Sequence, residues 1–153
     1  MIGFFSKYKP LEFKLQILTK HKICFMNHKC MGQFFIYLFI LLSSNSCRKE
    51  NPNLVSAYNK YKNASFKKGK GFEIFSVSLD NNATKWKNAI KKDKLSWKYH
   101  VSDLKGWNSE AAKTYKVRSI PQSYLINPEG IIIAKNLRGM RLHTTLDKYV
   151  KSF

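Results

Sequence analysis

One run of ten residues, Gln33–Leu42, constrains the fold of this 153-residue chain more than any other segment, because it is apolar after its first residue. A transmembrane helix needs about twenty predominantly apolar residues, so this run is too short to cross a membrane. Two interpretations remain for a run of this length. It is either a fully buried β-strand or the apolar part of a signal peptide.

The signal-peptide interpretation begins at Met26, where a basic start, the apolar run and a group of small residues lead to Cys47, as in a bacterial lipoprotein. Ser44 fits this pattern poorly, because leucine is usual at that position. We therefore favour the buried strand. The chain then divides into a basic N-terminal segment, 1–32, to which the sequence assigns no fold, and one domain over residues 33–153.

The charge of the chain is extreme, with 28 Lys and Arg residues against 9 Asp and Glu and a formal net charge of +19. A nucleic-acid-binding protein would concentrate these charges on one face and interleave them with aromatic residues. Here the lysines extend from Lys7 to Lys151, mostly on the polar sides of the expected helices. We therefore expect a solvated surface rather than a nucleic-acid interface. Attraction to anionic membrane surfaces follows from the charge in either case.

The three cysteines are Cys24, Cys30 and Cys47, an odd number without a short paired spacing, which argues against a disulfide framework. His21 and His28 lie close to the first two cysteines in the sequence. Their spacing matches no common zinc pattern, so we expect neither a metal site nor another cofactor.

The expected regular elements follow one another in the order strand, helix, strand, helix, helix, hairpin of two strands, helix. A short extended stretch lies between the second and third helices. The expected ranges are a strand at 33–42, a helix at 47–62, a loop at 64–71, a strand at 72–79, a helix after residue 80, an extended stretch at 97–101, a helix at 108–115, a hairpin of 122–126 and 131–135, and a helix at 142–150. This order is that of an α/β protein with the thioredoxin fold. It predicts a mixed central sheet, with a parallel pair and an antiparallel hairpin, flanked by helices.

Several segments of the chain, in the right order, carry a family resemblance. They are Cys47–Leu54, Trp86, Ser102–Trp107, Val117–Pro121 and Asn127–Gly139. Through them the region from about Gln33 to Val150 resembles bacterial TlpA-like thiol–disulfide oxidoreductases of the thioredoxin-like superfamily, which are related to the alkyl hydroperoxide reductase and thiol-specific antioxidant group. The resemblance implies a protein of the bacterial cell envelope, periplasmic or membrane-associated, that acts on protein thiols, disulfides or extended peptides.

The catalytic Cys-x-x-Cys pair of such proteins is incomplete in this chain, which reads Ser44-x-x-Cys47. By the resemblance, Cys47 matches the resolving cysteine and Ser44 occupies the position of the attacking cysteine. A thiolate attacks the substrate disulfide and a second thiol resolves the mixed disulfide, so both steps need sulfur. An alcohol ionises at far too high a pH and forms no disulfide. We therefore expect dithiol exchange to be lost or weakened.

The resemblance also assigns a role to Pro121, which matches the cis-proline that faces the active-site cysteines. The backbone at Ile120 and Pro121 would then pair with an incoming peptide. Two alternatives stay open. The chain is a non-catalytic, peptide-binding thioredoxin-like module, or it is a truncated or frame-shifted remnant of an active protein, because the departures from the family pattern all lie upstream of Cys47.

Overall fold

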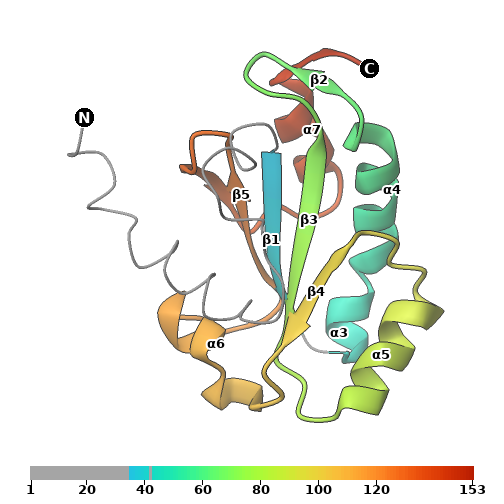
Figure 1. Ribbon diagram of the computed structural model, residues 1–153, viewed down its shortest axis with the longest axis vertical. Helices are drawn as coiled ribbons and strands as arrows, with labels where there is room; N and C mark the ends of the chain where they lie inside the picture. The colour runs from blue at the N-terminus through green and yellow to red at the C-terminus, as the bar shows by residue number, and fades with distance from the viewer. Residues whose placement is uncertain (1–34, 42) are drawn as a thin grey trace.

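The main sheet has five strands in the order β4-β3-β1-β5-β6, as a computed structural model of the chain shows for residues 35–41 and 43–153 (Figure 1). The strands are β1 (Phe35–Leu41), β3 (Phe72–Ser78), β4 (Tyr99–Ser102), β5 (Gln122–Ile126) and β6 (Ile132–Lys135). β1, β3 and β4 are parallel, whereas β5 and β6 form the antiparallel hairpin. The predicted α/β thioredoxin fold with a mixed sheet is confirmed. Segment 1–32 lies outside the described residues, so the domain boundary stays a prediction.

β1 is the middle strand of the sheet, and every one of its seven residues is buried. It pairs in parallel with β3, where Phe39 is opposite Ser76, and antiparallel with β5, where Phe39 is opposite Ser123. A strand with neighbours on both edges and helices on both faces has no contact with water, which explains an uninterrupted apolar sequence. The buried-strand interpretation is therefore confirmed for residues 35–41.

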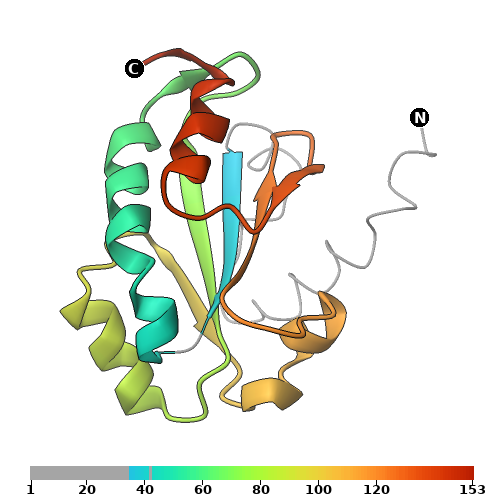
Figure 2. The ribbon, with the colours of Figure 1, turned by 180° about the vertical axis from the view of Figure 1, so that it is seen from behind.

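The alternation of side chains along β1 divides the core into two parts. Phe35, Tyr37, Phe39 and Leu41 face a cluster that contains the buried apolar residues of two helices, α4 (Asn51–Tyr61) and α7 (Met140–Asp147). The three residues between them face a second cluster, which is closed by α6 (Glu110–Thr114). Figure 2 shows α4 and α7 in front of the sheet. The helices are α3 (Asn45–Arg48), α4 (Asn51–Tyr61), α5 (Ala83–Lys92), the 3₁₀ turn η2 (Gly106–Asn108), α6 (Glu110–Thr114) and α7 (Met140–Asp147).

The prediction of one helix from Cys47 to Lys62 is wrong, because the chain forms two helices, α3 and α4, separated at residues 49–50. Pro52 explains the break. Inside a continuous helix its ring would clash with the carbonyl group four residues earlier, whereas in the first turn of a new helix its missing N–H is not needed. Pro52 lies in that first turn of α4.

Two short strands were not predicted. β2 (Ser65–Phe66) lies in the expected loop, and β7 (Val150–Ser152) follows α7, which ends at Asp147 rather than at residue 150. The two strands pair with each other in a separate two-stranded sheet. Strands of two and three residues are too short to show an alternating pattern, so the sequence carries no signal for them.

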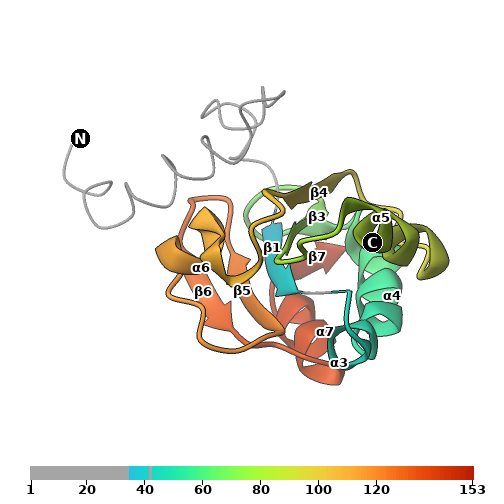
Figure 3. The same cartoon turned by 90° about the horizontal axis from the view of Figure 1, so that it is seen from below.

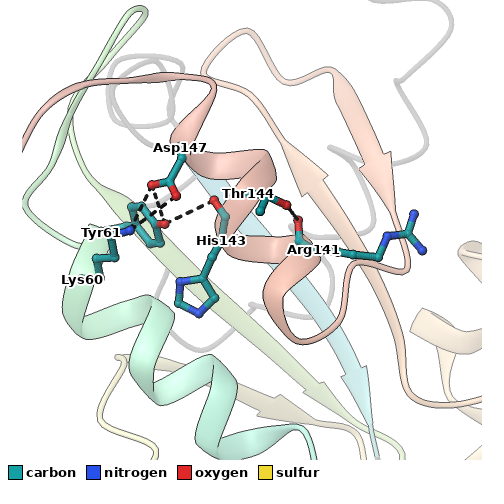
Figure 4. A network of polar contacts seen from close by, with 6 residues as sticks. All are labelled: Lys60, Tyr61, Arg141, His143, Thr144 and Asp147. Atoms are coloured by element: carbon teal, nitrogen blue, oxygen red, sulfur yellow. Dashed lines mark hydrogen bonds and ion pairs between the residues drawn. The ribbon is translucent and has the colours of Figure 1, made fainter.

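The ends of α4 and α7 that lie beside this small sheet are joined by polar side chains (Figure 4). The Tyr61 hydroxyl donates to Asp147 Oδ1 at 2.7 Å, and Lys60 Nζ lies 3.1 Å from the same oxygen. The His143 ring lies beside Tyr61, with ring centroids 5.6 Å apart.

Among the residues that the structure describes, no helix is long and apolar enough to cross a membrane.

Candidate redox site at the end of β1

The segments with sequence-predicted site residues meet at one edge of the main sheet. Parallel strands end at a common edge, so the chain leaves β1, β3 and β4 there, and the antiparallel β5 begins there. Ile40 in β1 is opposite Gln122 in β5, which places the chain after β1 beside the chain before β5. Figure 3 views this edge, with β1 ending between α6 and α3.

Ser44 and Cys47 differ sharply in exposure. Ser44 precedes α3 with an extended backbone (φ −75°, ψ 154°) and is exposed. The Cys47 side chain is 0% exposed and belongs to the core cluster under α4. Cys47 is also the third residue of the four-residue α3, so the expectation that it opens a long helix is wrong. The position that meets solvent therefore carries a hydroxyl, and the only sulfur of this pair lies beneath it.

The residue before Ser44 is fixed to the neighbouring strand. The Ser43 hydroxyl donates to Asp80 Oδ1 at 2.6 Å, and the Ser43 N–H donates to Asp80 Oδ2 at 3.0 Å. The Ser78 hydroxyl donates to Oδ2 of the same carboxylate at 2.5 Å. Asp80 thus receives bonds from the chain after β1 and from the end of β3. These bonds hold the exposed turn at Ser44 against the sheet.

Pro121 lies across from this turn, at the start of β5. The Ile120–Pro121 peptide bond is cis, and the proline is buried. Ile120 is half-buried and packs against both parts of the core. Arg138 reaches this loop from the segment between β6 and α7, with its Nη2 donating to the Pro121 carbonyl oxygen at 2.7 Å.

Glu50 links the cysteine segment to the same region. It precedes α4, and its Oε1 accepts hydrogen bonds from the Gly139 N–H and from Asn53 Nδ2, each at 2.7 Å. The Tyr37 hydroxyl donates to the Leu137 carbonyl oxygen. Burial raises the pKa of Tyr37, so this hydroxyl stays protonated and keeps donating at any physiological pH.

A small pocket lies on the other side of α3, between that helix, α5 and the sheet. Ser43, Asn51, Trp86 and His100 are among the residues that line it. Burial lowers the pKa of His100, which favours the neutral ring at neutral pH. No group of three or more His, Cys, Asp or Glu side chains in residues 35–41 and 43–153 could hold a metal ion. Cys24, Cys30 and the neighbouring histidines lie outside those residues.

Three residues with contacts at this edge were given no role by the sequence: Tyr37, Asp80 and Arg138. Tyr37 is one of the ten residues of the apolar run, and nothing in the sequence indicates that its hydroxyl donates a hydrogen bond. Asp80 directly follows a strand and reads as a turn residue. Arg138 lies in a segment that carries the resemblance, which is the one signal that could have drawn attention to it.

Comparison with known proteins agrees with the fold. Residues 32–132 match the sequence model of a family described as thioredoxin-like. The chain is 31% identical over 156 residues to a protein named thiol-disulfide oxidoreductase ResA from Bacillus cereus, with 97% of this chain and 83% of that protein covered.

Solved structures give the same result. A thiol-disulfide oxidoreductase from Bacteroides fragilis superposes with a TM-score of 0.69 and 30% identity, covering 83% of this chain and 88% of that one. The thioredoxin domain of a thiol-disulfide oxidoreductase from Bacteroides vulgatus superposes with a TM-score of 0.67 and 32% identity, covering 78% of this chain and 81% of that one.

Proposed function

Because the chain belongs to the thioredoxin-like family of thiol–disulfide oxidoreductases, we propose that it keeps the fold and the binding groove of the family with dithiol exchange lost or weakened. The observation that carries this proposal is the pairing of an exposed Ser44 with a fully buried Cys47. An attacking thiol has to reach a substrate disulfide, whereas a resolving thiol does not. The accessible position of the pair is therefore the one without sulfur.

The chemistry shows why the missing sulfur matters. In a dithiol protein the first thiolate attacks one sulfur of the substrate disulfide, forms a mixed disulfide and releases the other substrate sulfur as a thiolate. The second protein thiolate then attacks the mixed disulfide and releases the substrate in reduced form, leaving a protein disulfide. Two electrons pass to the substrate. Cys47 could take the second role, but Ser44 cannot take the first.

The test is reduction of insulin disulfides, with dithiothreitol as the electron source, by the natural chain and by Ser44→Cys. We expect turnover by Ser44→Cys and only the uncatalysed background rate with the natural chain. Ser46→Cys is the matched control, because Ser46 is also exposed but its spacing from Cys47 cannot make Cys-x-x-Cys. Cys24 and Cys30 are present in all three chains, so any rate that they support is common to all.

Two results would count against the proposal. Rapid turnover by the natural chain would show that exchange is intact. No turnover by either chain would favour the alternative that the chain is a remnant of an active protein.

A second candidate function is a non-catalytic peptide-binding module. Its support is the apolar surface near the site, where Trp107 is 52% exposed and Leu104 is 39% exposed. Both follow β4, whose end lies at the same edge of the sheet as Ser44 and Pro121. Exposed apolar side chains that form a contiguous patch often mark surfaces that contact other proteins, and Leu104 and Trp107 are only three positions apart in the chain. In this function an extended peptide binds beside Pro121 without any redox step, and loss of binding on Cys47→Ser would argue against it.

The bacterial cell envelope is the location that we propose with this function. Stable disulfides are found in oxidising compartments, so proteins that act on them are useful there. The bacterial relatives named as thiol-disulfide oxidoreductases are consistent with this location. The net charge of +19 would add attraction to the anionic surface of a membrane. Fractionation of cells into cytoplasmic, periplasmic and membrane samples would test it.

A further inference from the structure

Arg138 is carried by a short segment, residues 136–139, that is fixed to the fold on both sides. The Asn136 N–H donates to the Ser123 carbonyl oxygen in β5 at 2.8 Å. The Leu137 side chain is 5% exposed and its carbonyl oxygen accepts the hydrogen bond from Tyr37 in β1. Gly139 then bonds to Glu50 beside α4. Because these contacts hold the backbone of residues 136–139, they fix the position from which the Arg138 side chain extends.

The guanidinium group of Arg138 uses one of its nitrogens within the protein. Nη2 donates to the Pro121 carbonyl oxygen at 2.7 Å, although the residue as a whole is exposed. An arginine carries five N–H donors in a rigid plane, so further donors remain for a ligand. No carboxylate of the described residues lies within ion-pair distance of Arg138. Its positive charge is therefore available beside the cis-proline.

A second exposed arginine, Arg118, lies three residues before Pro121 and also lacks an ion pair within the described part of the chain. The acidic side chains at this edge are already occupied. Asp80 accepts bonds from Ser43, and Asp103 accepts them from the Glu110 N–H. Glu50, which accepts from the Gly139 N–H beside Arg138, is occupied in the same way. Among the described residues, the edge thus has arginines without a carboxylate partner and carboxylates that already accept hydrogen bonds.

We propose that Arg138 is a specificity-determining residue that pairs with a carboxylate of an extended peptide bound beside Pro121. The occupant is an acidic peptide, because charge complementarity at this edge favours one. The inference rests on the proposed groove. Arginine suits this role because its planar guanidinium group can donate to the Pro121 carbonyl and to a ligand carboxylate at the same time.

The experiment has to separate a local effect from the general attraction of a chain with a net charge of +19. Two fluorescein-labelled ten-residue peptides, identical except for Glu or Gln at one central position, are titrated with the full chain by fluorescence anisotropy at 0.15 M salt. The chains are the natural protein, Arg138→Gln, Arg138→Lys and Lys151→Gln. Lys151 is the matched control, since it is exposed in β7, in the small sheet away from the site.

We expect the natural chain to bind the Glu peptide about threefold to fivefold more tightly than the Gln peptide, the range for one partly exposed ion pair. Arg138→Gln should abolish this preference, because it lowers the affinity for the Glu peptide more than that for the Gln peptide, whereas a general disturbance of the groove would lower both affinities by the same factor. Arg138→Lys should keep part of the preference, because the charge stays but the fork is lost. Lys151→Gln should keep all of it.

A preference that survives in Arg138→Gln, or that falls equally in Lys151→Gln, would overturn the inference and leave the groove standing. Loss of affinity for both peptides by the same factor in Arg138→Gln would also overturn it, since the residue would then act only on structure. Absence of binding of either peptide to the natural chain would overturn the proposed groove itself.

Discussion

The two ends of helix α4 are held by the same kind of contact, an aspartate that accepts bonds from one basic and one neutral side chain. At the start, near the candidate site, Asp93 Oδ2 accepts from Arg48 Nε and from Asn51 Nδ2, each at 2.7 Å. Asp93 also ends α5, so these bonds join three helices. At the other end the aspartate is Asp147, on α7.

The difference between the ends lies in exposure and in the shape of the cation. The Asp93 side chain is 13% exposed and accepts hydrogen bonds from the Arg48 guanidinium group. The Asp147 side chain is 46% exposed and accepts from Lys60 Nζ and the Tyr61 hydroxyl. Water competes for the second set of bonds and screens its charges. The bonds to Asp93 should therefore stabilise the fold more than the bonds to Asp147.

The largest expected effect is that of Asp93→Asn, which removes the charged acceptor for two side chains. We expect the free energy of unfolding to fall by about 2 kcal/mol at pH 7, because hydrogen bonds to charged groups contribute about 1.5–3 kcal/mol. Urea unfolding measures it. Asp147→Asn is the matched change at the far end and should have a clearly smaller effect; equal losses would show that exposure does not separate the two ends.

The same variant has a pH signature. The Arg48 guanidinium holds the pKa of Asp93 below its ordinary value. A carboxyl group with a lower pKa in the folded state stabilises fully above its unfolded pKa, about 3.9, and this contribution is lost as the pH falls through the folded pKa. The stability difference between the natural chain and Asp93→Asn should therefore be constant near neutrality and narrow below about pH 4. A difference that widens in acid would contradict the assignment.

Tyr61→Phe comes next. It removes the hydroxyl that donates to Asp147 and leaves the fully buried ring in place. We expect a loss of about 1 kcal/mol, the usual net value of one hydrogen bond. Tyr149→Phe is the control, because the Tyr149 hydroxyl forms no hydrogen bond among the described residues, and it should change stability little. Peptide binding at the far side of the molecule should be unaffected by either change.

The smallest effect should come from Lys60→Gln. Both partners of the Lys60–Asp147 pair are more than 40% exposed, and exposed ion pairs contribute about 0.2–1 kcal/mol, so we expect a loss of about 0.5 kcal/mol. Unfolding measured with and without 0.5 M salt should show that salt removes the difference between the natural chain and the variant. A loss as large as that of Tyr61→Phe would mean that the lysine, rather than the tyrosine, holds this end of α4.

The sequence predicts most of the sheet because its strands are long enough to display a pattern. β1 is a continuous apolar run, and β3 and β5 lie within the predicted ranges. The break between α3 and α4 was missed because Pro52 is compatible with a kinked helix and with the start of a new one. β2 and β7 were missed because two or three residues carry no periodicity.

The candidate site was predicted only in part, for a different reason. The spacing of Ser44 and Cys47 and the Ile120–Pro121 pair are local features that a sequence displays directly. The contacts that join them are between residues far apart in the chain. Glu50 and Gly139 are separated by 89 positions, and Arg138 and Pro121 by 17. Such pairs depend on strand order and register, which one sequence does not reveal.

The central place of β1 has a consequence for how the chain is made. β1 is synthesised before both of its partners, since β3 follows only after α4, and β5 only after α6. Until then the apolar segment of β1 has no strand paired with either of its edges. Such a segment can pair with other chains and seed aggregation. Molecular chaperones that bind extended apolar segments would therefore bind this protein at β1. The yield of folded chain would depend on how long they keep β1 from pairing with other chains.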